Sequence, residues 1–451
     1  MVLNGTKTSL RNKRFITKKS SRMLQTISRF NASSRQNLRK TSMCSSKRSS
    51  SVDIKSSQEI RLSLVRCLET AKSNSIIIDD ESSSSIPVSS EKNKYTVLED
   101  GLCMLIMSDL IYVLTDLRRH AEKTSDTKLQ QQLAIPQHSF GLSFAIAENA
   151  NLVLKGPEAA KFSMRVLMYV NEEELDTCNQ EDDGTNNKSG VDNNDNRYSS
   201  VEYLADCPEN YVRSCVYDIS VNHSAKRIIV TFRGTTNSRD WITNFDLLPR
   251  CEVNPIRDIM FSTPMVWVHR GFSKAILRQR DQIVSWIGQY KKDHPKTKDY
   301  SLFVTGHSMG GALATIFAYY TCLDTDITAR KPLVCYTFGA PPVGKKNFAK
   351  VFRRLEDDGK IRLARFYNAN DPVPNCLKVH GYIQNGQGIE MRSGGNTKFV
   401  MEDHSTCSRL MIGLCRSMEE HLPEVNQRNM QTNCSHLLSK RSLEELYCSQ
   451  R

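Results

Sequence analysis

The residues with the clearest chemical potential are Gly306-His307-Ser308-Met309-Gly310. A β-rich run, Tyr300–Thr305, precedes them, and an apolar run, Gly310–Tyr320, follows. A strand, a sharp turn and a helix in this order are the context of a nucleophilic serine, which needs small residues two positions before and after it. A tight glycine turn with an incidental serine would give the same five letters, but the flanking segments favour the nucleophile. The pattern predicts that Ser308 attacks a carbonyl and forms a covalent intermediate.

The oxyanion formed by such an attack needs two backbone amides, one from the residue after the nucleophile and one from a separate loop. Met309 supplies the first at the start of the predicted helix, where the helix dipole adds partial positive charge. The hydrophobic run Ile228–Phe232 ends in Arg233-Gly234-Thr235-Thr236, a glycine turn followed by hydroxyl side chains. This turn is the candidate for the second amide.

An acid and a histidine should follow the serine along the chain. A strand-like run, Ile361–Asn368, leads to Asp371 in Asn370-Asp371-Pro372-Val373-Pro374. A carboxylate just past the carboxyl end of a strand can orient a histidine, and an Asp-Pro turn is compatible with that role. Asp371 is therefore the predicted acid.

Strand-like and helix-like runs alternate around these segments. Val212–Val221 and Arg227–Phe232 are β-rich, residues 273–290 have apolar residues at helical spacing, and Leu302–Thr305 is a buried type of strand. Such alternation predicts an α/β fold in which crossover helices flank a central sheet.

Four segments together resemble one family. They are Val230–Thr235, Asp240-Trp241-Ile242, Val268–Phe272 and Gly306–Ala314, and in this order they are similar to the class 3 lipases, the fungal-lipase-like family. The resemblance covers about residues 100–450. It implies an α/β-hydrolase fold with a mostly parallel central sheet, and a serine carboxylester hydrolase that acts on acylglycerols or related glycerolipids through a Ser-His-Asp acyl-enzyme mechanism.

The resemblance also implies roles for single residues. Thr235 would lend its backbone amide to the oxyanion, and the segment around Asp371 matches the family's Asn-Asp-Pro-Val-Pro signature. Trp241 and the apolar segment up to Val266 would lie where family members carry a movable lid. His269 is expected to be a structural histidine.

The histidine of the triad is less defined by the sequence. Four histidines follow the acid: His380, His404, His421 and His436. His380 is too close to the acid. His421, in Met418–Val425, resembles the segment that carries the base in the diacylglycerol lipase branch. It lies 50 residues after Asp371, near the spacing between acid and histidine in fungal members, so it is the expected base. His436 and His404 remain alternatives, because none of the three is followed by the aromatic residue usual in fungal members.

Two other functions remain open at this point: a catalytically silent lipid-binding protein that keeps the fold, and an esterase on non-lipid esters. The proposed chemistry needs neither a metal nor an organic cofactor. The fourteen cysteines are scattered, with no Cys-x-x-Cys pair, and favour free thiols in a reducing compartment over a metal site.

Charge is concentrated at the N-terminus. Residues 1–52 contain thirteen Lys or Arg and no Asp or Glu, which accounts for the formal charge of +13, so the remainder is balanced. We expect residues 1–95 to be a disordered basic Ser-rich tail and residues 96–450 to be the catalytic domain. The tail fits organellar targeting, contact with anionic lipid or a solvated linker. Nucleic acid is not an expected partner, because aromatic residues that could stack on bases are few.

The remaining expectations concern location and insertions. No apolar core of a secretory signal follows Met1, and Leu102–Leu117 contains Asp109 and Asp116, so we expect a buried helix there and no membrane span. The protein is expected to be intracellular, in the cytoplasm or a mitochondrion or plastid. Residues 171–199 are acidic and Asn-rich and are expected to be a surface insertion.

Overall fold

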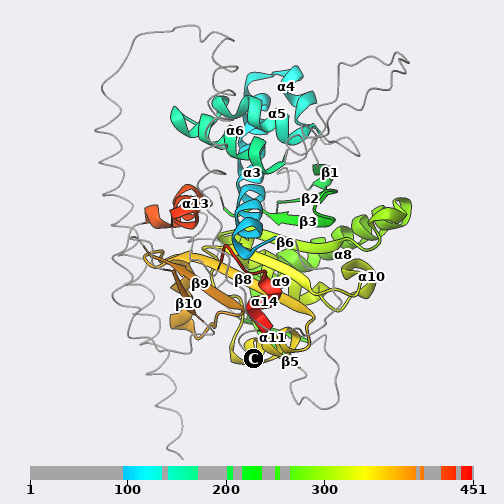
Figure 1. Ribbon diagram of the computed structural model, residues 1–451, viewed down its shortest axis with the longest axis vertical. Helices are drawn as coiled ribbons and strands as arrows, with labels where there is room; N and C mark the ends of the chain where they lie inside the picture. The colour runs from blue at the N-terminus through cyan, green and yellow to red at the C-terminus, as the bar shows by residue number, and fades with distance from the viewer. Residues whose placement is uncertain are drawn as a thin grey trace, which may run out of the picture. The chain divides into compact units, whose positions relative to one another are not determined.

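The computed structural model is built around an eight-stranded sheet with the strand order β1-β2-β3-β6-β7-β8-β9-β10 (Figure 1). It describes residues 95–134, 141–170, 201–206, 216–235, 249–253, 265–392, 397–400, 418–432 and 438–448. The strands of the sheet are β1 (Val201–Asp206), β2 (Tyr217–Asn222), β3 (Arg227–Phe232), β6 (Ser301–His307), β7 (Leu333–Phe338), β8 (Ile361–Asn368), β9 (Gln387–Met391) and β10 (Thr397–Val400).

The middle of the sheet is parallel and its two edges are antiparallel. β3, β6, β7, β8 and β9 pair in parallel, whereas β1, β2 and β10 join through antiparallel ladders. Parallel strands bring their carboxyl ends to one edge, which is where α/β proteins place their sites. Together with the flanking helices, this is the predicted α/β-hydrolase architecture.

The helices connect the strands and cover both faces of the sheet. They are α3 (Val97–Thr124), α4 (Thr127–Gln132), α5 (Leu142–Asn149), α6 (Pro157–Val170), α8 (Arg270–Asp293), α9 (Met309–Thr321), α10 (Thr325–Thr328), α11 (Lys346–Asp357), α13 (Pro423–Thr432) and α14 (Leu443–Cys448). Short 3-10 turns are η1 (Ala150–Leu152), η4 (Pro295–Thr297), η5 (Val373–Asn375), η6 (Lys378–His380) and η8 (Met418–His421).

Successive side chains of a strand point to opposite faces of the sheet, so the core is divided between the two faces. In β6, Leu302 and Val304 pack with α8, α9 and α11, whereas Phe303 points to the opposite face and packs with α3, α13 and α14. A third cluster joins the second half of α3 to α4, α5, α6 and β1. The sheet is thus buried on both faces, as the continuous apolar runs of its central strands require.

The first described helix, α3, is held by a capping box at its start and by a contact with β3. Thr96 and Glu99 form a capping box at the start of α3. Asp100 then makes a buried 2.6 Å ion pair with Arg227 at the start of β3, and the Arg227 guanidinium lies over the Phe303 ring. These contacts hold α3 along the sheet at a position set by the β3 backbone.

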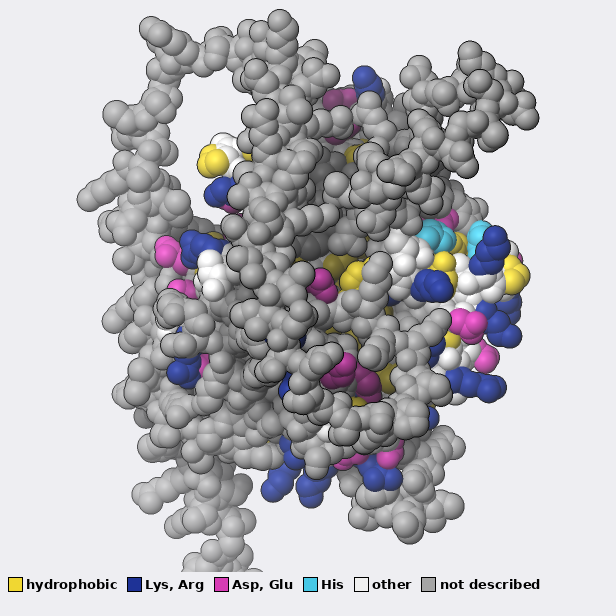
Figure 2. Space-filling model, viewed as in Figure 1, with side chains coloured by type: hydrophobic (Ala, Val, Ile, Leu, Met, Phe, Trp, Pro, Cys, Tyr) yellow, Lys and Arg dark blue, Asp and Glu magenta, His cyan; other side chains and the backbone are white. Residues whose placement is uncertain are grey.

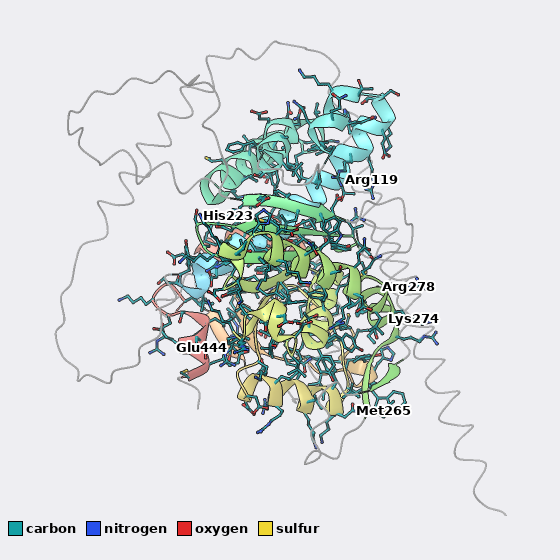
Figure 3. All side chains as sticks on the ribbon, turned by 90° about the vertical axis from the view of Figure 1, so that its right-hand side faces the viewer. Arg119, His223, Met265, Lys274, Arg278 and Glu444 are labelled. Atoms are coloured by element: carbon teal, nitrogen blue, oxygen red, sulfur yellow. The ribbon has the colours of Figure 1, made fainter. Side chains whose placement is uncertain are left out.

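The surface helix α8 is the helix expected over residues 273–290, and it is longer, from Arg270 to Asp293. Its pattern is amphipathic, as expected. Ile276, Ile283 and Ile287 are buried, whereas Lys274 and Arg278 project from its outer face (Figure 3). Over the described part of the face in Figure 2, basic and acidic side chains are interspersed. This mixture agrees with the balanced charge of the chain beyond residue 52.

One expectation about the lid needs correction. β4 (Pro249–Val253) and β5 (Met265–His269) form a separate two-stranded antiparallel sheet within and beyond the expected lid span. Val266 is fully buried in the core beside α8, so the end of that span is a packed strand and cannot belong to a movable lid. Trp241 lies outside the described residues.

Other expectations fall partly or wholly outside the described residues. These are the tail up to residue 94, the insertion 171–199, and the first part of the strand expected over Val212–Val221, of which Tyr217–Val221 lies in β2. The helix expected over Leu102–Leu117 is α3, and it is buried against the sheet. No described helix is long and apolar enough to cross a membrane.

Gly310 permits the close approach of α9 to β3. A Cβ at this position would overlap the Phe232 carbonyl oxygen and lie 2.8 Å from the Phe232 carbonyl carbon, and backbone atoms cannot move aside cheaply. We expect Gly310→Ala to lower the free energy of unfolding by about 2 kcal/mol or more, measured by urea denaturation.

Gly288 on α8 is the matched control, since a Cβ there would meet no heavy atom within 4 Å. We expect Gly288→Ala to raise the free energy of unfolding by about 0.5–1 kcal/mol, because alanine favours a helix interior. Equal denaturation midpoints for the two variants would contradict the packing described for α9.

Candidate active site

Ser308 lies in the sharp turn between β6 and α9. Its backbone angles are φ 57° and ψ −126°, a conformation that costs a non-glycine residue about 1–3 kcal/mol. The Ser308 amide donates a 2.8 Å hydrogen bond to the Phe338 carbonyl of β7, which helps to hold the turn. The predicted nucleophile elbow is present, and the side chain stands at the carboxyl edge of the parallel strands.

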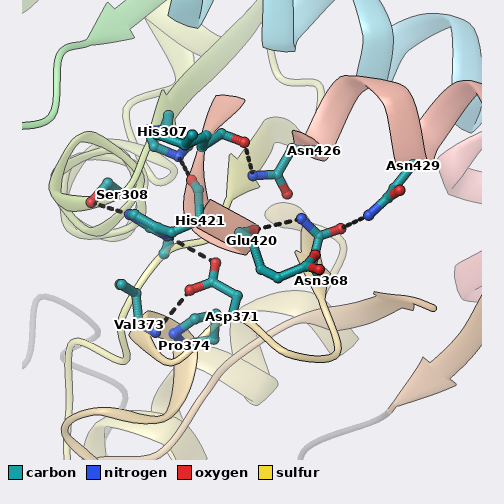
Figure 4. A network of polar contacts seen from close by, with 12 residues as sticks. His307, Ser308, Asn368, Asp371, Val373, Pro374, Glu420, His421, Asn426 and Asn429 are labelled. Carbon is teal, nitrogen blue, oxygen red and sulfur yellow. Dashed lines mark hydrogen bonds and ion pairs between the residues drawn. The ribbon is translucent and has the colours of Figure 1, made fainter. Parts of the chain in front are cut away.

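The structure brings His421 to the serine. His421 ends the turn η8, and its Nε2 lies 2.8 Å from Ser308 Oγ, although 113 positions separate the two residues (Figure 4). His421 is buried, with 7% of its surface exposed. Of the three histidines considered as the base, His404 and His436 lie outside the described residues.

Asp371 completes the arrangement from the loop after β8. Its Oδ2 lies 2.8 Å from His421 Nδ1, and its Oδ1 accepts a 2.9 Å hydrogen bond from the Val373 amide. Burial raises the pKa of the Asp371 carboxyl, and the neighbouring His421 and the Val373 amide oppose that rise. Because the carboxylate only accepts, Nδ1 of His421 carries the proton and Nε2 faces the serine hydroxyl as an acceptor.

A second layer of hydrogen bonds holds the segment that carries His421. Asn368 Nδ2 donates to the Glu420 carbonyl at 2.6 Å, and Asn429 Nδ2 donates to Asn368 Oδ1 at 2.8 Å (Figure 4). From the other side, His307 Nε2 lies 2.8 Å from the His421 carbonyl. The sequence prediction missed these three supporting side chains.

Local sequence signals for them are weak. Asn368 closes β8 three residues before the acid, which is the one feature that could have drawn attention to it. His307 lies between Gly306 and Ser308 in the pentapeptide, and Asn429 lies on α13, four residues after the segment Met418–Val425. Their partners are two backbone carbonyls and the Asn368 side chain, all in distant segments, which no local pattern specifies.

The oxyanion side of the site is formed by the ends of two adjacent strands. Phe232 of β3 is in register with Gly306 of β6, so the residues after each strand lie side by side. A Cβ on Gly234 would lie 3.3 Å from Ser308 Cβ, which places the turn before Thr235 directly against the nucleophile. The Met309 amide begins α9, where an α-helix has no intrahelical acceptor for its first amides. The turn before Thr235 and the start of α9 at Met309 thus lie beside Ser308, and the oxyanion roles of Thr235 and Met309 stay predictions.

His269 and His380 lie outside the triad. His269 is fully buried; its Nδ1 accepts a hydrogen bond from the Phe272 amide at the start of α8, and its ring stacks on Phe272 with 3.9 Å between centroids. His380 ends the 3-10 turn η6. Within the part of the chain that the structure describes, no group of three or more His, Cys, Asp or Glu is arranged to hold a metal ion.

The site places a neutral serine hydroxyl, the nucleophile, beside a histidine that can act as its base. His421 can take the Ser308 proton as Oγ attacks a carbonyl, while Asp371 stabilises the imidazolium that results. The geometry thus supports acyl transfer from an ester or a related acyl compound.

Part of the chain that carries this site matches a known family model. Residues 229–380 match the family model described as Lipase (class 3). In this segment the chain is similar to the class 3 lipases. The matched segment contains Thr235, Ser308, Met309 and Asp371 and ends before His421.

Two curated relatives match this chain over similar lengths. The secreted mono- and diacylglycerol lipase 1 of Fusarium solani is 32% identical over 206 residues, which are 44% of this chain and 54% of that protein. The chloroplastic galactolipase DONGLE of Arabidopsis thaliana is 31% identical over 217 residues, 44% of this chain and 41% of that protein. The chain spans about half the length of the curated relatives it matches.

Among solved structures, the native lipase propeptide complex of Rhizomucor miehei is similar, with 23% identity and a TM-score of 0.39. The match covers 50% of this chain and 68% of the Rhizomucor miehei chain.

The geometry predicts a specific role for Asp371. In Asp371→Asn the amide can donate to His421 Nδ1, which favours the tautomer with its proton on Nε2, and this tautomer cannot accept the serine proton. We expect kcat for ester hydrolysis to fall about 10⁴-fold, the scale of such losses in serine hydrolases. The loss should appear in steady-state kinetics with a soluble short-chain ester, while the circular dichroism spectrum is unchanged. A fully active, folded Asp371→Asn variant would contradict the assigned role.

Proposed function

We propose that this chain is a serine carboxylester hydrolase that acts on acylglycerols or related glycerolipids. The observation that carries the proposal is the continuous relay from Ser308 Oγ through His421 to Asp371, with 2.8 Å at each of its two contacts. The substrate class draws on the relatives, whose names describe a mono- and diacylglycerol lipase, a galactolipase and phospholipases A1. Each of these names refers to fatty acyl esters of a glycerolipid.

The proposed reaction follows from the positions of the side chains. Ser308 Oγ attacks the acyl carbonyl as His421 Nε2 accepts its proton, and the amides of Met309 and Thr235 stabilise the tetrahedral oxyanion. One such donor contributes about 3 kcal/mol to lowering the barrier. His421 then protonates the leaving alkoxide, which frees the alcohol and leaves the acyl group on Ser308. Water, activated by the same histidine, releases the fatty acid.

A serine-directed probe tests the chemistry. We expect a fluorophosphonate to label the wild-type chain and to leave Ser308→Ala unlabelled, because only an activated serine reacts. Ser224→Ala is the matched control, since Ser224 lies on the exposed turn between β2 and β3, and it should be labelled like wild type. An unlabelled wild type would overturn the enzyme proposal in favour of a catalytically silent lipid-binding protein.

Substrate assays with the same variants test the lipid assignment. The panel is a long-chain triacylglycerol, monogalactosyl diacylglycerol, phosphatidylcholine and a feruloyl ester. We expect fatty acid release from at least one glycerolipid in wild type and none in Ser308→Ala. Activity confined to the feruloyl ester would contradict the lipid substrate.

We also propose that the basic segment 1–52 contributes contact with anionic lipid at the substrate surface. Its thirteen cationic side chains and lack of acidic residues support this, since each basic residue near an anionic membrane contributes about 1 kcal/mol of attraction. A vesicle arm of the substrate assay tests it. A chain lacking residues 1–52 should lose hydrolysis on anionic vesicles and keep hydrolysis of a soluble ester, and equal loss or retention on both would contradict the proposal.

A further inference from the structure

Tyr112 reaches the active site from outside the segment that matches the class 3 lipase family. It lies on α3, which runs against β3, β6 and β7. Its hydroxyl oxygen is 3.3 Å from Nδ1 of His307, and the two rings meet edge to face, with 6.0 Å between centroids and an interplanar angle of 67°. The contact is therefore directed through the hydroxyl group and not through stacking.

The same hydroxyl oxygen contacts the turn that leads to Thr235. Tyr112 Oη packs directly against Gly234. A side chain on Gly234 would overlap this oxygen and would lie 2.7 Å from the His307 carbonyl oxygen, so only glycine fits between the tyrosine and the elbow. Tyr112 Oη thus packs where the ends of β3 and β6 meet.

The chemistry of His307 fixes the direction of the remaining hydrogen bonds. Its Nε2 faces the His421 carbonyl, which can only accept, so Nε2 carries the proton. Burial lowers the pKa of the His307 ring to about 3, so the ring is neutral and its Nδ1 is an acceptor. Tyr112 therefore donates its hydroxyl proton to Nδ1.

The contacts form one chain from the oxyanion turn to the catalytic base: Gly234 packs against Tyr112 Oη, the Tyr112 hydroxyl donates to His307 Nδ1, and His307 Nε2–H donates to the carbonyl of His421. We propose that Tyr112 is a positioning residue that aligns the oxyanion turn with the base through His307. This inference rests on the proposed hydrolase function and assigns a role to α3 in it.

Loss of the hydroxyl has a defined consequence along this chain. His307 Nδ1 would lose its donor, and the ring could rotate or exchange tautomers. In either case the His421 carbonyl would lose the bond that fixes it from the elbow side, while Asn368 would still hold Glu420 from the other side. The base would then be less well aligned with Ser308 Oγ, although each triad side chain would remain.

Tyr112→Phe removes this one oxygen and keeps the ring. We expect kcat for a soluble short-chain ester to fall about 10- to 100-fold, since small misalignment of reacting groups has effects of that size. KM should stay within about threefold, because an alignment defect acts on the chemical step more than on substrate binding. The melting temperature should change little. A kcat within twofold of wild type would overturn the proposal.

Tyr203→Phe is the matched control. Tyr203 is a buried tyrosine on β1 whose hydroxyl has no hydrogen-bond partner among the described residues. We expect its kcat to equal that of wild type. If both variants lose kcat in proportion to a lowered melting temperature, Tyr112 is merely structural and the proposal fails.

A double-mutant cycle tests whether Tyr112 acts through His307. We expect His307→Gln to lower kcat, and Tyr112→Phe/His307→Gln to be no slower than His307→Gln alone. Losses of the two single variants that multiply in the double variant would show independent roles and would overturn the relay.

A readout that does not depend on turnover separates this inference from the hydrolase proposal. In the full chain labelled with ¹⁵N-histidine, the His307 signals, assigned with His307→Gln, should show the neutral Nε2–H tautomer at pH 5, and Tyr112→Phe should shift both the His307 and the His421 signals. Unchanged signals in Tyr112→Phe would refute the relay even if no ester is hydrolysed. Shifted signals without any hydrolysis would refute only the hydrolase function.

Discussion

The active site depends on one strained turn. Ser308 can face a histidine from the far end of the domain only because the chain holds it in a backbone conformation that serine disfavours. The surrounding packing stabilises that conformation. The Ser308 amide bonds to β7, and Gly310 lies so close to the Phe232 carbonyl that no side chain fits. The register of β3, β6 and β7 thus fixes where the nucleophile stands, and the other groups must be brought to it.

The base reaches the nucleophile in a different way. Ser308 and Asp371 follow directly from β6 and β8, so the sheet positions both of them. His421 ends a short 3-10 turn instead, and side chains from other segments hold its backbone. Asn368 binds the carbonyl before it and His307 binds its own carbonyl. A site in which two members are fixed by strands and the third by hydrogen bonds to its backbone depends on its supporting shell for alignment.

The difference explains how far the sequence could predict this site. Ser308, Met309 and Asp371 are each specified by a local pattern of a strand followed by a turn, and the structure has them where those patterns place them. His421 was expected on the basis of a resemblance, and its proximity to Ser308 became visible only in three dimensions. Tyr112 and Asn368 were not predicted, because their roles depend on contacts with residues that are distant in the sequence.

The fold, too, was predicted in part from the sequence. Apolar, β-rich runs predicted the central strands and the helical spacing of apolar residues predicted α8, whereas the Thr96–Glu99 capping box that starts α3 was present in the sequence and was overlooked. The lid expectation for Val266 was wrong, because an apolar run beside a movable segment and an apolar run in a packed strand look alike before tertiary contacts are known.

The central claim is that His421 is the base for Ser308. Its most direct test is kcat/KM for a soluble ester in three variants, His421→Ala, His404→Ala and His436→Ala. We expect a loss of about 10³-fold or more in His421→Ala, as is usual when a triad member is removed, with the other two variants within about threefold of wild type. Retained activity in His421→Ala, with loss in either of the others, would contradict it.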